Sequence, residues 1–268
     1  MKGEESSRRV AAIFIDLDFG VRMKTVVRWC WRLSLVILLA FILLQLWFFA
    51  CVLWWSNFNP ESTSFMRAEL TRLQEKKPAA KLQHQWADYG KISTHLKRAV
   101  IASEDGKFAG HDGIDWDAIE KAYTHNRKLE EEREKAIAKG RKPSRKPMHG
   151  GSTITQQVAK NLFLSGERSY LRKGQEFVIT YMLEGAMHKR RILELYLNVA
   201  EWGEGVFGAE AAARHYFGVS AAQLDALQAA QLAAMLPRPR FYDKNRSSAY
   251  LASRTWSVWM RMPDAELP

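Results

Sequence analysis

The sequence predicts a mainly α-helical protein in which one transmembrane helix precedes an α-rich soluble domain. One observation is an uninterrupted apolar run at 33–55. The other is that apolar side chains in the domain recur every three or four positions, which is the spacing of one helix face. No segment shows the strict alternation of a half-buried strand, and no internal repeat is found. A chain of 268 residues suffices for one domain with appendages.

Charge and cysteine content narrow the function classes. Lys and Arg total 40 against 29 Asp and Glu, a formal net charge of +11. This excess indicates an anionic partner, but nucleic acid, anionic lipid and a phosphorylated substrate all satisfy it. Cys30 and Cys51 lie at or inside the apolar run. In a helix they would be roughly 30 Å apart, too far for a disulfide, and the rest of the chain has no thiol for a metal site.

The apolar run 33–55 is predicted to span a membrane. As a helix it would be about 35 Å long, against a hydrocarbon core of about 30 Å. Tryptophans lie near both of its ends, as in an aromatic belt: Trp29, Trp31, Trp54 and Trp55. Basic residues precede the run and none occurs in 56–65, so residues 1–32 are expected as a cytoplasmic tail and the domain as exported. A cleaved signal peptide is the competing interpretation, and Met23 is an alternative start to Met1.

The remaining elements follow in chain order. Residues 56–94 are expected as a polar connecting segment, 95–245 as the domain and 246–268 as a C-terminal tail. A first helix should end at Glu104, and a second should run from Ile114 to Tyr123. Three later helices are predicted from periodicity and caps: one through Ile154, Val158 and Leu162, one over 168–198 broken near Gly185, and one that follows a Ser220–Gln223 capping box and ends at Pro237.

A dense charge run, 126–149, interrupts the domain. It contains two prolines and Gly140, so a solvated and partly mobile insertion is the favoured interpretation. Contact between its basic half and anionic lipid head groups is the alternative.

The segment 104–113 combines adjacent carboxylates with a glycine-rich turn. Glu104 and Asp105 lie at a helix end, followed by Phe108 and His111. The C-terminal end of a helix dipole should raise the pKa of Glu104 above about 4.3, which would make it a better general base. Taken alone, two carboxylates on a solvated helix end would be the simpler interpretation.

The segment 150–157 leads two glycines and two hydroxyl side chains into a helix. Backbone N–H groups at such a helix start can bind an anion or a sugar. An ordinary N-cap is the alternative. It does not explain the paired Gln156 and Gln157 or the later Lys160 and Asn161.

A third cluster is rich in cations. Arg168, Arg172 and Glu176 are spaced i, i+4 and i+8 on one helix face, with Lys173 beside them. Surface ion pairs worth about 0.3 to 0.5 kcal/mol each are the alternative. Three cations around one carboxylate exceed what such pairing needs, so they indicate an anionic ligand.

In this order, the segments resemble the peptidoglycan glycosyltransferases, family 51 of the glycosyltransferases. The family motifs Glu-Asp-x-x-Phe-x-x-His-x-Gly, Gly-Gly-Ser-x-Ile-x-Gln-Gln, Arg-Lys-x-x-Glu and Ile-Leu-Glu-x-Tyr-Leu-Asn stand at 104–113, 150–157, 172–176 and 192–198. Similarity covers roughly 90–240 and implies a lysozyme-like α-rich glycosyltransferase domain. The insertion before the second motif is longer than usual, and Gln175 stands where some relatives carry a basic residue.

The resemblance implies polymerisation of lipid II into β-1,4 glycan strands, with release of undecaprenyl pyrophosphate and inversion at the anomeric carbon. Glu104 would be the general base and Glu176 a second essential carboxylate. Glu194, Asn198 and His111 would be structural. Substrate binding would fall to Asp105, Phe108, Gly151, Ser152, Thr153, Gln156, Gln157, Lys160, Asn161, Arg168, Arg172 and Lys173. No cofactor is required by the sequence, and although some relatives respond to divalent cations, no cluster here has metal-ligand spacing.

Two rival functions remain at this point. A lysozyme-like lytic enzyme would need a protonated carboxyl and would gain little from the cation cluster. A catalytically inactive, membrane-tethered scaffold would not need Glu104 and Glu176. Nucleic-acid binding explains only the charge.

No transpeptidase module is expected, because the sequence lacks a Ser-x-x-Lys motif. The resemblance therefore implies a monofunctional, moenomycin-sensitive polymerase of a Gram-negative inner membrane. Its expected partners are other cell-wall synthases and division proteins.

Overall fold

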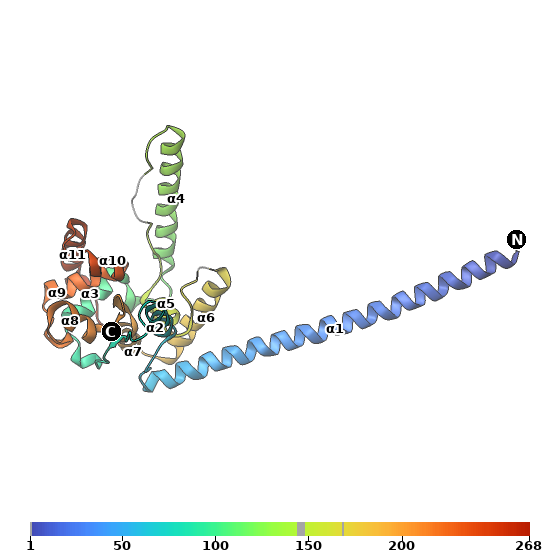
Figure 1. Ribbon diagram of the computed structural model, residues 1–268, viewed down its shortest axis with the longest axis horizontal. Coiled ribbons are helices and arrows are strands. Elements are labelled where there is room, and N and C mark those ends of the chain that lie inside the picture. Colours follow the sequence, from blue (N-terminus) through green and yellow to red (C-terminus); the bar gives the residue numbers. More distant parts are fainter. Residues whose placement is uncertain (1, 144–147, 168) are drawn as a thin grey trace. The chain divides into compact units, whose positions relative to one another are not determined.

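The computed structural model describes residues 2–143, 148–167 and 169–268, with side chains described from residue 26 onwards (Figure 1). The chain divides into two compact units, of which the first ends at Cys51 and the second runs from Val52 to Pro268.

A single long helix, α1 (Lys2–Asn57), makes up the first unit and continues into the start of the second. Its part from Val26 to Asn57 is long and apolar enough to cross a membrane. Apolar side chains such as Leu38 and Phe41 are exposed around it, as expected of a helix that contacts lipid. The predicted run 33–55 lies within this candidate membrane span.

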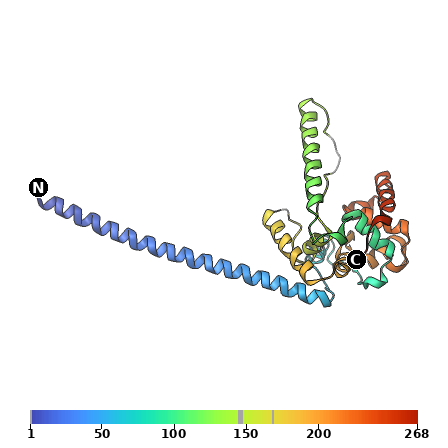
Figure 2. The ribbon, with the colours of Figure 1, turned by 180° about the vertical axis from the view of Figure 1, so that it is seen from behind.

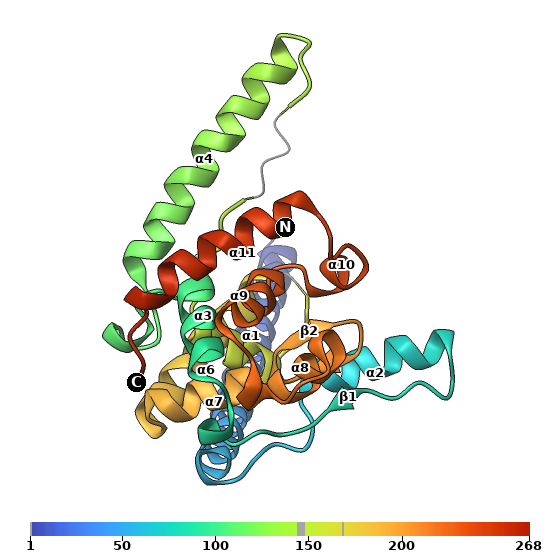
Figure 3. The same ribbon diagram turned by 90° about the vertical axis from the view of Figure 1, so that its left-hand side faces the viewer.

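The second unit is built almost entirely of helices. They are α2 (Ser64–Lys76), α3 (Thr94–Glu104), α4 (Trp116–Ala138), α5 (Ile154–Phe163), α6 (Tyr170–Ala186), α7 (Lys189–Val199), α8 (Ala209–Phe217), α9 (Ala226–Met235), α10 (Pro239–Lys244) and α11 (Ala249–Arg261). Two groups form the core. In one, α9 packs between α3 and α11 (Figure 3). In the other, α5 packs against α6 and α7. Buried alanines on α9, such as Ala230 and Ala233, let its neighbours approach closely.

The part of the chain that the structure describes contains three short strands, although no alternating pattern in the sequence indicates a strand. They are β1 (Gln83–His84), β2 (Glu201–Gly203) and β3 (Val206–Phe207), in the order β1-β3-β2. β3 pairs in parallel with β1 and antiparallel with β2. Strands of two or three residues are too short for an alternating pattern to be detected in the sequence.

The charged insertion is partly helical. Asp115 caps α4 as predicted, its carboxylate accepting from the Ala118 N–H at 2.9 Å, but the helix continues past Tyr123 to Ala138. Glu, Lys, Ala and Arg dominate this extension, and all favour helix. Gly140, with a φ of +65°, follows the end of the helix. Figure 2 shows α4 extending away from the rest of the second unit.

Two boundaries near the C-terminus also differ from expectation. The Ser220–Gln223 capping box closes a short 3-10 turn, and α9 has its own box from Asp225 and Gln228. The segment 246–268 is not a tail, because it contains α11. The buried side chains of α11 are spaced for one helix face, which packs on α9 and α3: Leu251, Thr255 and Val258.

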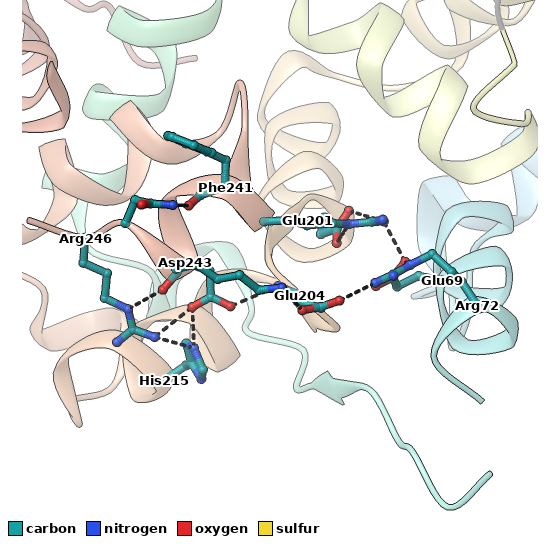
Figure 4. Close-up of polar contacts among 11 residues, drawn as sticks. Glu69, Arg72, Glu201, Glu204, His215, Phe241, Asp243 and Arg246 are labelled. Atoms are coloured by element: carbon teal, nitrogen blue, oxygen red, sulfur yellow. Dashed lines mark hydrogen bonds and ion pairs between the residues drawn. The ribbon is translucent and has the colours of Figure 1, made fainter. Parts of the chain in front are cut away.

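The connecting segment 56–94 is likewise part of the folded unit, because α2 lies within it. Buried Glu69 of α2 accepts from Arg72 and Arg240, both at 2.7 Å. These two arginines also bind Glu204 at 2.8 Å and Glu201 at 2.6 Å, respectively, next to β2 and α10 (Figure 4). This ion-pair network joins α2 to the C-terminal part of the unit, which local sequence patterns do not reveal.

Candidate active site

Glu104 is the last residue of α3, and the packing of that helix fixes its position. Val100 and Ile101 on α3 are fully buried. The carboxylate of Glu104 is partly accessible and accepts from the Gln157 side-chain N–H at 2.7 Å. Burial raises its pKa above the ordinary value, whereas the Gln157 hydrogen bond and the charges of Arg254 and Lys160 act in the opposite direction. A carboxylate with a raised pKa suits proton transfer near neutral pH.

Asp105, next to Glu104, joins the first two motifs. One carboxylate oxygen lies 2.9 Å from the His111 imidazole, and the other accepts from the Ile154 N–H at 3.0 Å, at the start of α5. Phe108 is fully buried, with the Lys189 ammonium 4.6 Å from its ring centre. Both side chains are therefore engaged in packing, and their predicted contact with substrate remains a prediction.

The second motif forms the start of α5. Thr153 and Gln156 make a reciprocal capping box, and the Thr153 hydroxyl donates to the Gly113 carbonyl at 2.6 Å. Both side chains are buried. Gly151 passes so close to α4 that an added Cβ would lie 3.0 Å from Ile119 Cα. The capping alternative thus accounts for Thr153 and Gln156, whereas Ser152 is exposed.

The third motif surrounds a buried carboxylate. Glu176 on α6 is only 2% exposed and binds Arg172 at 2.7 Å and Lys173. Lys173 also lies 3.4 Å from the Ser152 hydroxyl, so the second and third motifs meet here. Arg168, the fourth predicted member, lies outside the described residues.

Lys160 on α5 interacts electrostatically with the carboxylates of both Glu176 and Glu104. Burial lowers its pKa, the positive charges of Arg172 and Lys173 lower it further, and the negative charges of Glu176 and Glu104 raise it. The structure therefore brings two sets of residues together. One is Glu104 with Gln157 and Lys160 of α5. The other is the cluster of Arg172, Lys173 and Glu176 on α6. Asn161, also predicted to bind substrate, is buried on α5.

Two residues of the site were not predicted. The Tyr196 hydroxyl donates to the Gln157 side-chain oxygen at 3.3 Å, which leaves the amide N–H of Gln157 for Glu104. Tyr196 lies in the fourth motif, so a signal for it was present. Arg254 lowers the pKa of Glu104 from α11, a segment expected as a tail.

Metal ligation finds no support in the part of the chain that the structure describes. No group of three or more His, Cys, Asp or Glu side chains there could hold a metal ion. The site instead offers organic cations beside a carboxylate of raised pKa.

Comparison with known proteins places this arrangement in a family. The family model described as transglycosylase matches residues 70–263. The chain belongs to the transglycosylase family. This result confirms the predicted fold class, a mainly α lysozyme-like domain behind one N-terminal apolar helix, and it confirms that the protein is a glycosyltransferase.

Several relatives of this transglycosylase match over nearly their whole length. A protein of Herminiimonas arsenicoxydans is 60% identical over 246 residues, which cover 92% of this chain and 100% of that protein. Relatives from Janthinobacterium sp. (strain Marseille) and Methylobacillus flagellatus are 60% and 54% identical, each over 89% of this chain. All three are described as biosynthetic peptidoglycan transglycosylases.

Proposed function

We propose that this transglycosylase polymerises lipid II into the β-1,4-linked glycan strands of peptidoglycan. The names of relatives at 54 to 60% identity support a role in cell-wall biosynthesis. One observation carries the assignment of chemistry: α5 connects a carboxylate to a cation cluster. Its Gln157 donates to Glu104 at 2.7 Å, and Ser152, just before the helix, lies 3.4 Å from Lys173, one of the two cations bound to Glu176.

Glu104 is the general base in this proposal. It takes the proton of the acceptor sugar's 4-hydroxyl while that oxygen attacks the anomeric carbon of the donor. The bond between that carbon and the pyrophosphate oxygen breaks, undecaprenyl pyrophosphate leaves, and the configuration inverts. The Gln157 side chain orients the carboxylate, since Tyr196 holds the Gln157 amide in turn.

Lys160, Arg172 and Lys173 are proposed to stabilise the departing pyrophosphate. Cations aimed at developing negative charge are an efficient device in a site that excludes water. Glu176 holds two of them in place. A raised carboxylate pKa alone would also suit the general acid of a lytic enzyme. The cation cluster favours the transferase because hydrolysis of a glycan releases no phosphate.

The proposed setting is the inner membrane, with α1 as a single-pass anchor, the N-terminus in the cytoplasm and the catalytic domain in the periplasm. The apolar segment Val26–Asn57 and the basic residues before it support this orientation. Other cell-wall synthases are the proposed protein partners.

The deciding experiment incubates the detergent-solubilised protein with purified lipid II, with and without moenomycin, and separates products on a gel. Moenomycin-sensitive polymer is expected, and Glu104→Gln should lower its rate by about 10²- to 10⁴-fold. Glu132→Gln, an exposed carboxylate on α4, is the matched control and should retain full activity. Cleavage of preformed glycan strands without synthesis would assign the protein to the lytic class.

A further inference from the structure

The point where the chain leaves α1 is held by one side chain of α7. The last carbonyls of any α-helix lack intrahelical partners. Here Arg191 donates from Nε and Nη2 to the Trp55 carbonyl, at 3.1 and 2.9 Å. Its Nη2 also reaches the Phe58 carbonyl at 2.8 Å and the Asn59 side-chain oxygen at 2.9 Å. All of these residues belong to the second unit.

Arg191 is itself held in place. Its Nη1 donates to Glu194 at 2.8 Å, one turn along α7, and the other Glu194 oxygen accepts from the Tyr89 N–H at 2.7 Å. The guanidinium also lies 5.4 Å from the ring centre of Trp86. All three guanidinium nitrogens are thus used, and the side chain is 15% exposed. A lysine has one ammonium and no planar fork, so it cannot reproduce this set of contacts.

The same stretch of chain is fastened to α5. The Trp55 ring contacts the Phe163 ring at 4.9 Å between centres, and the Ser64 hydroxyl donates to the Leu162 carbonyl at 3.1 Å. The Lys160 ammonium lies 5.4 Å from the ring centre of Phe65. Residues 55–65 therefore border the C-terminal half of the helix that carries the Gln157 and Lys160 of the site.

The far end of this connection is anchored as well. α2 follows directly and is tied by Glu69 and Arg72 to Arg240 and Glu204 (Figure 4). The chain from Trp55 through α2 thus contacts α7, α5 and the C-terminal part of the unit, which a free linker would not do.

We propose that Arg191 is a positioning residue for the transglycosylase reaction. By binding residues 55–59 to α7, it orders the chain between the apolar helix and the helices that carry Gln157 and Lys160, and this order matters when the lipid substrate and the apolar helix share one bilayer. This inference rests on the proposed function. Arg191 directly precedes the fourth motif, which begins at Ile192, and is not part of it.

The test compares Arg191→Ala and Arg191→Lys with the control Arg127→Gln, which alters an exposed arginine on α4, away from residues 55–65. Each is assayed with lipid II in vesicles and in detergent micelles. Arg191→Ala should lower the vesicle rate by about 10- to 100-fold relative to the micelle rate, since small misplacements of reacting groups are costly. Arg191→Lys should fall between, and Arg127→Gln should keep the wild-type ratio. A purely structural role would lower both rates equally.

A second readout needs no substrate. Hydrogen exchange of peptides covering 55–65 in the full-length protein should be faster in Arg191→Ala, while peptides of α9 stay unchanged. Asn59→Ala, which removes one acceptor, should act in the same direction more weakly, and it replaces Arg191→Ala if that variant does not fold. An unchanged vesicle-to-micelle ratio and unchanged exchange would overturn the inference. A wild-type protein that makes no polymer would instead overturn the proposed function.

Discussion

Burial and neighbouring groups act in opposite directions on the pKa of Glu104. At the C-terminal end of α3, burial raises the pKa of its carboxylate, while Gln157, Arg254 and Lys160 favour the charged form. The net shift is upward, so burial is the larger effect. A carboxylate with a raised pKa is more basic than a free carboxylate, so in its charged form it accepts a proton more readily. This is the property that a general base needs.

This shift has a consequence for stability. Because the pKa of Glu104 is raised in the folded state, folding takes up a proton between the ordinary pKa of 4.5 and the raised value, and stability falls as pH increases through that window. At pH 7 the charged form is a net cost. Glu104→Gln should therefore melt at a higher temperature than wild type at pH 7, and the two should converge near pH 4.

Differential scanning fluorimetry across that pH range makes the measurement. Glu132→Gln, fully outside the site, should show no pH-dependent difference. A lower melting temperature for Glu104→Gln at pH 7 would mean that the favourable contacts of the carboxylate outweigh its desolvation.

At the scale of elements, α5 is the centre of the site. Its first turn is capped by Thr153 and held by Asp105, its middle presents Gln157 to Glu104, and its end meets the chain that leaves α1. Residues that looked like ligands in the sequence therefore divide into two groups. Asp105, Thr153 and Gln156 place the helix, whereas Gln157 donates to Glu104 and Lys160 interacts electrostatically with Glu176 and Glu104.

α11 provides a test of the C-terminal boundary. Leu251 is 1% exposed and packs in the core formed with α9 and α3. Leu251→Ala should lower the free energy of unfolding by about 2 to 5 kcal/mol, because it removes buried carbon atoms and leaves a cavity. Ser253→Ala, exposed on the same helix, should change it by about 0.5 kcal/mol or less. Urea denaturation measures the free energy of unfolding of both variants. If both variants lost equally little stability, α11 would contribute little to the core.

At the scale of the whole molecule, the two units differ in what stabilises them. The second unit buries a core of its own, with Trp202, Tyr196 and Phe207 among its largest buried side chains. From Val26 onwards, where its side chains are described, the first unit exposes apolar side chains such as Val36 and Leu39, as expected where lipid replaces a protein core.

Deletion of residues 1–51 should therefore separate membrane binding from folding. The remaining chain is expected to melt cooperatively, because the core and the Arg191 contacts with residues 55–59 are retained. It should no longer float with lipid vesicles in a density gradient. Circular dichroism and flotation measure the two properties, with the full-length protein as reference. Loss of cooperative melting would show that the apolar helix stabilises the fold directly.

Features that depend only on neighbours along the chain can be predicted from the amino-acid sequence. The apolar run, the helix starting at Ile154, the Asp115 cap and the order of the motifs were all recognisable, because composition and a period of three or four residues are local properties. They were sufficient for the fold class and the family.

Contacts between residues that are far apart in the sequence become visible only in the folded protein. Glu104 meets Gln157 across 53 positions of sequence, and Arg191 meets Trp55 across 136. Burial of Glu104, the role of Arg254 on α11 and the pairing of the short strands also depend on which helices pack together. No local pattern encodes these contacts, since they arise only when the apolar faces of separate helices are buried against each other.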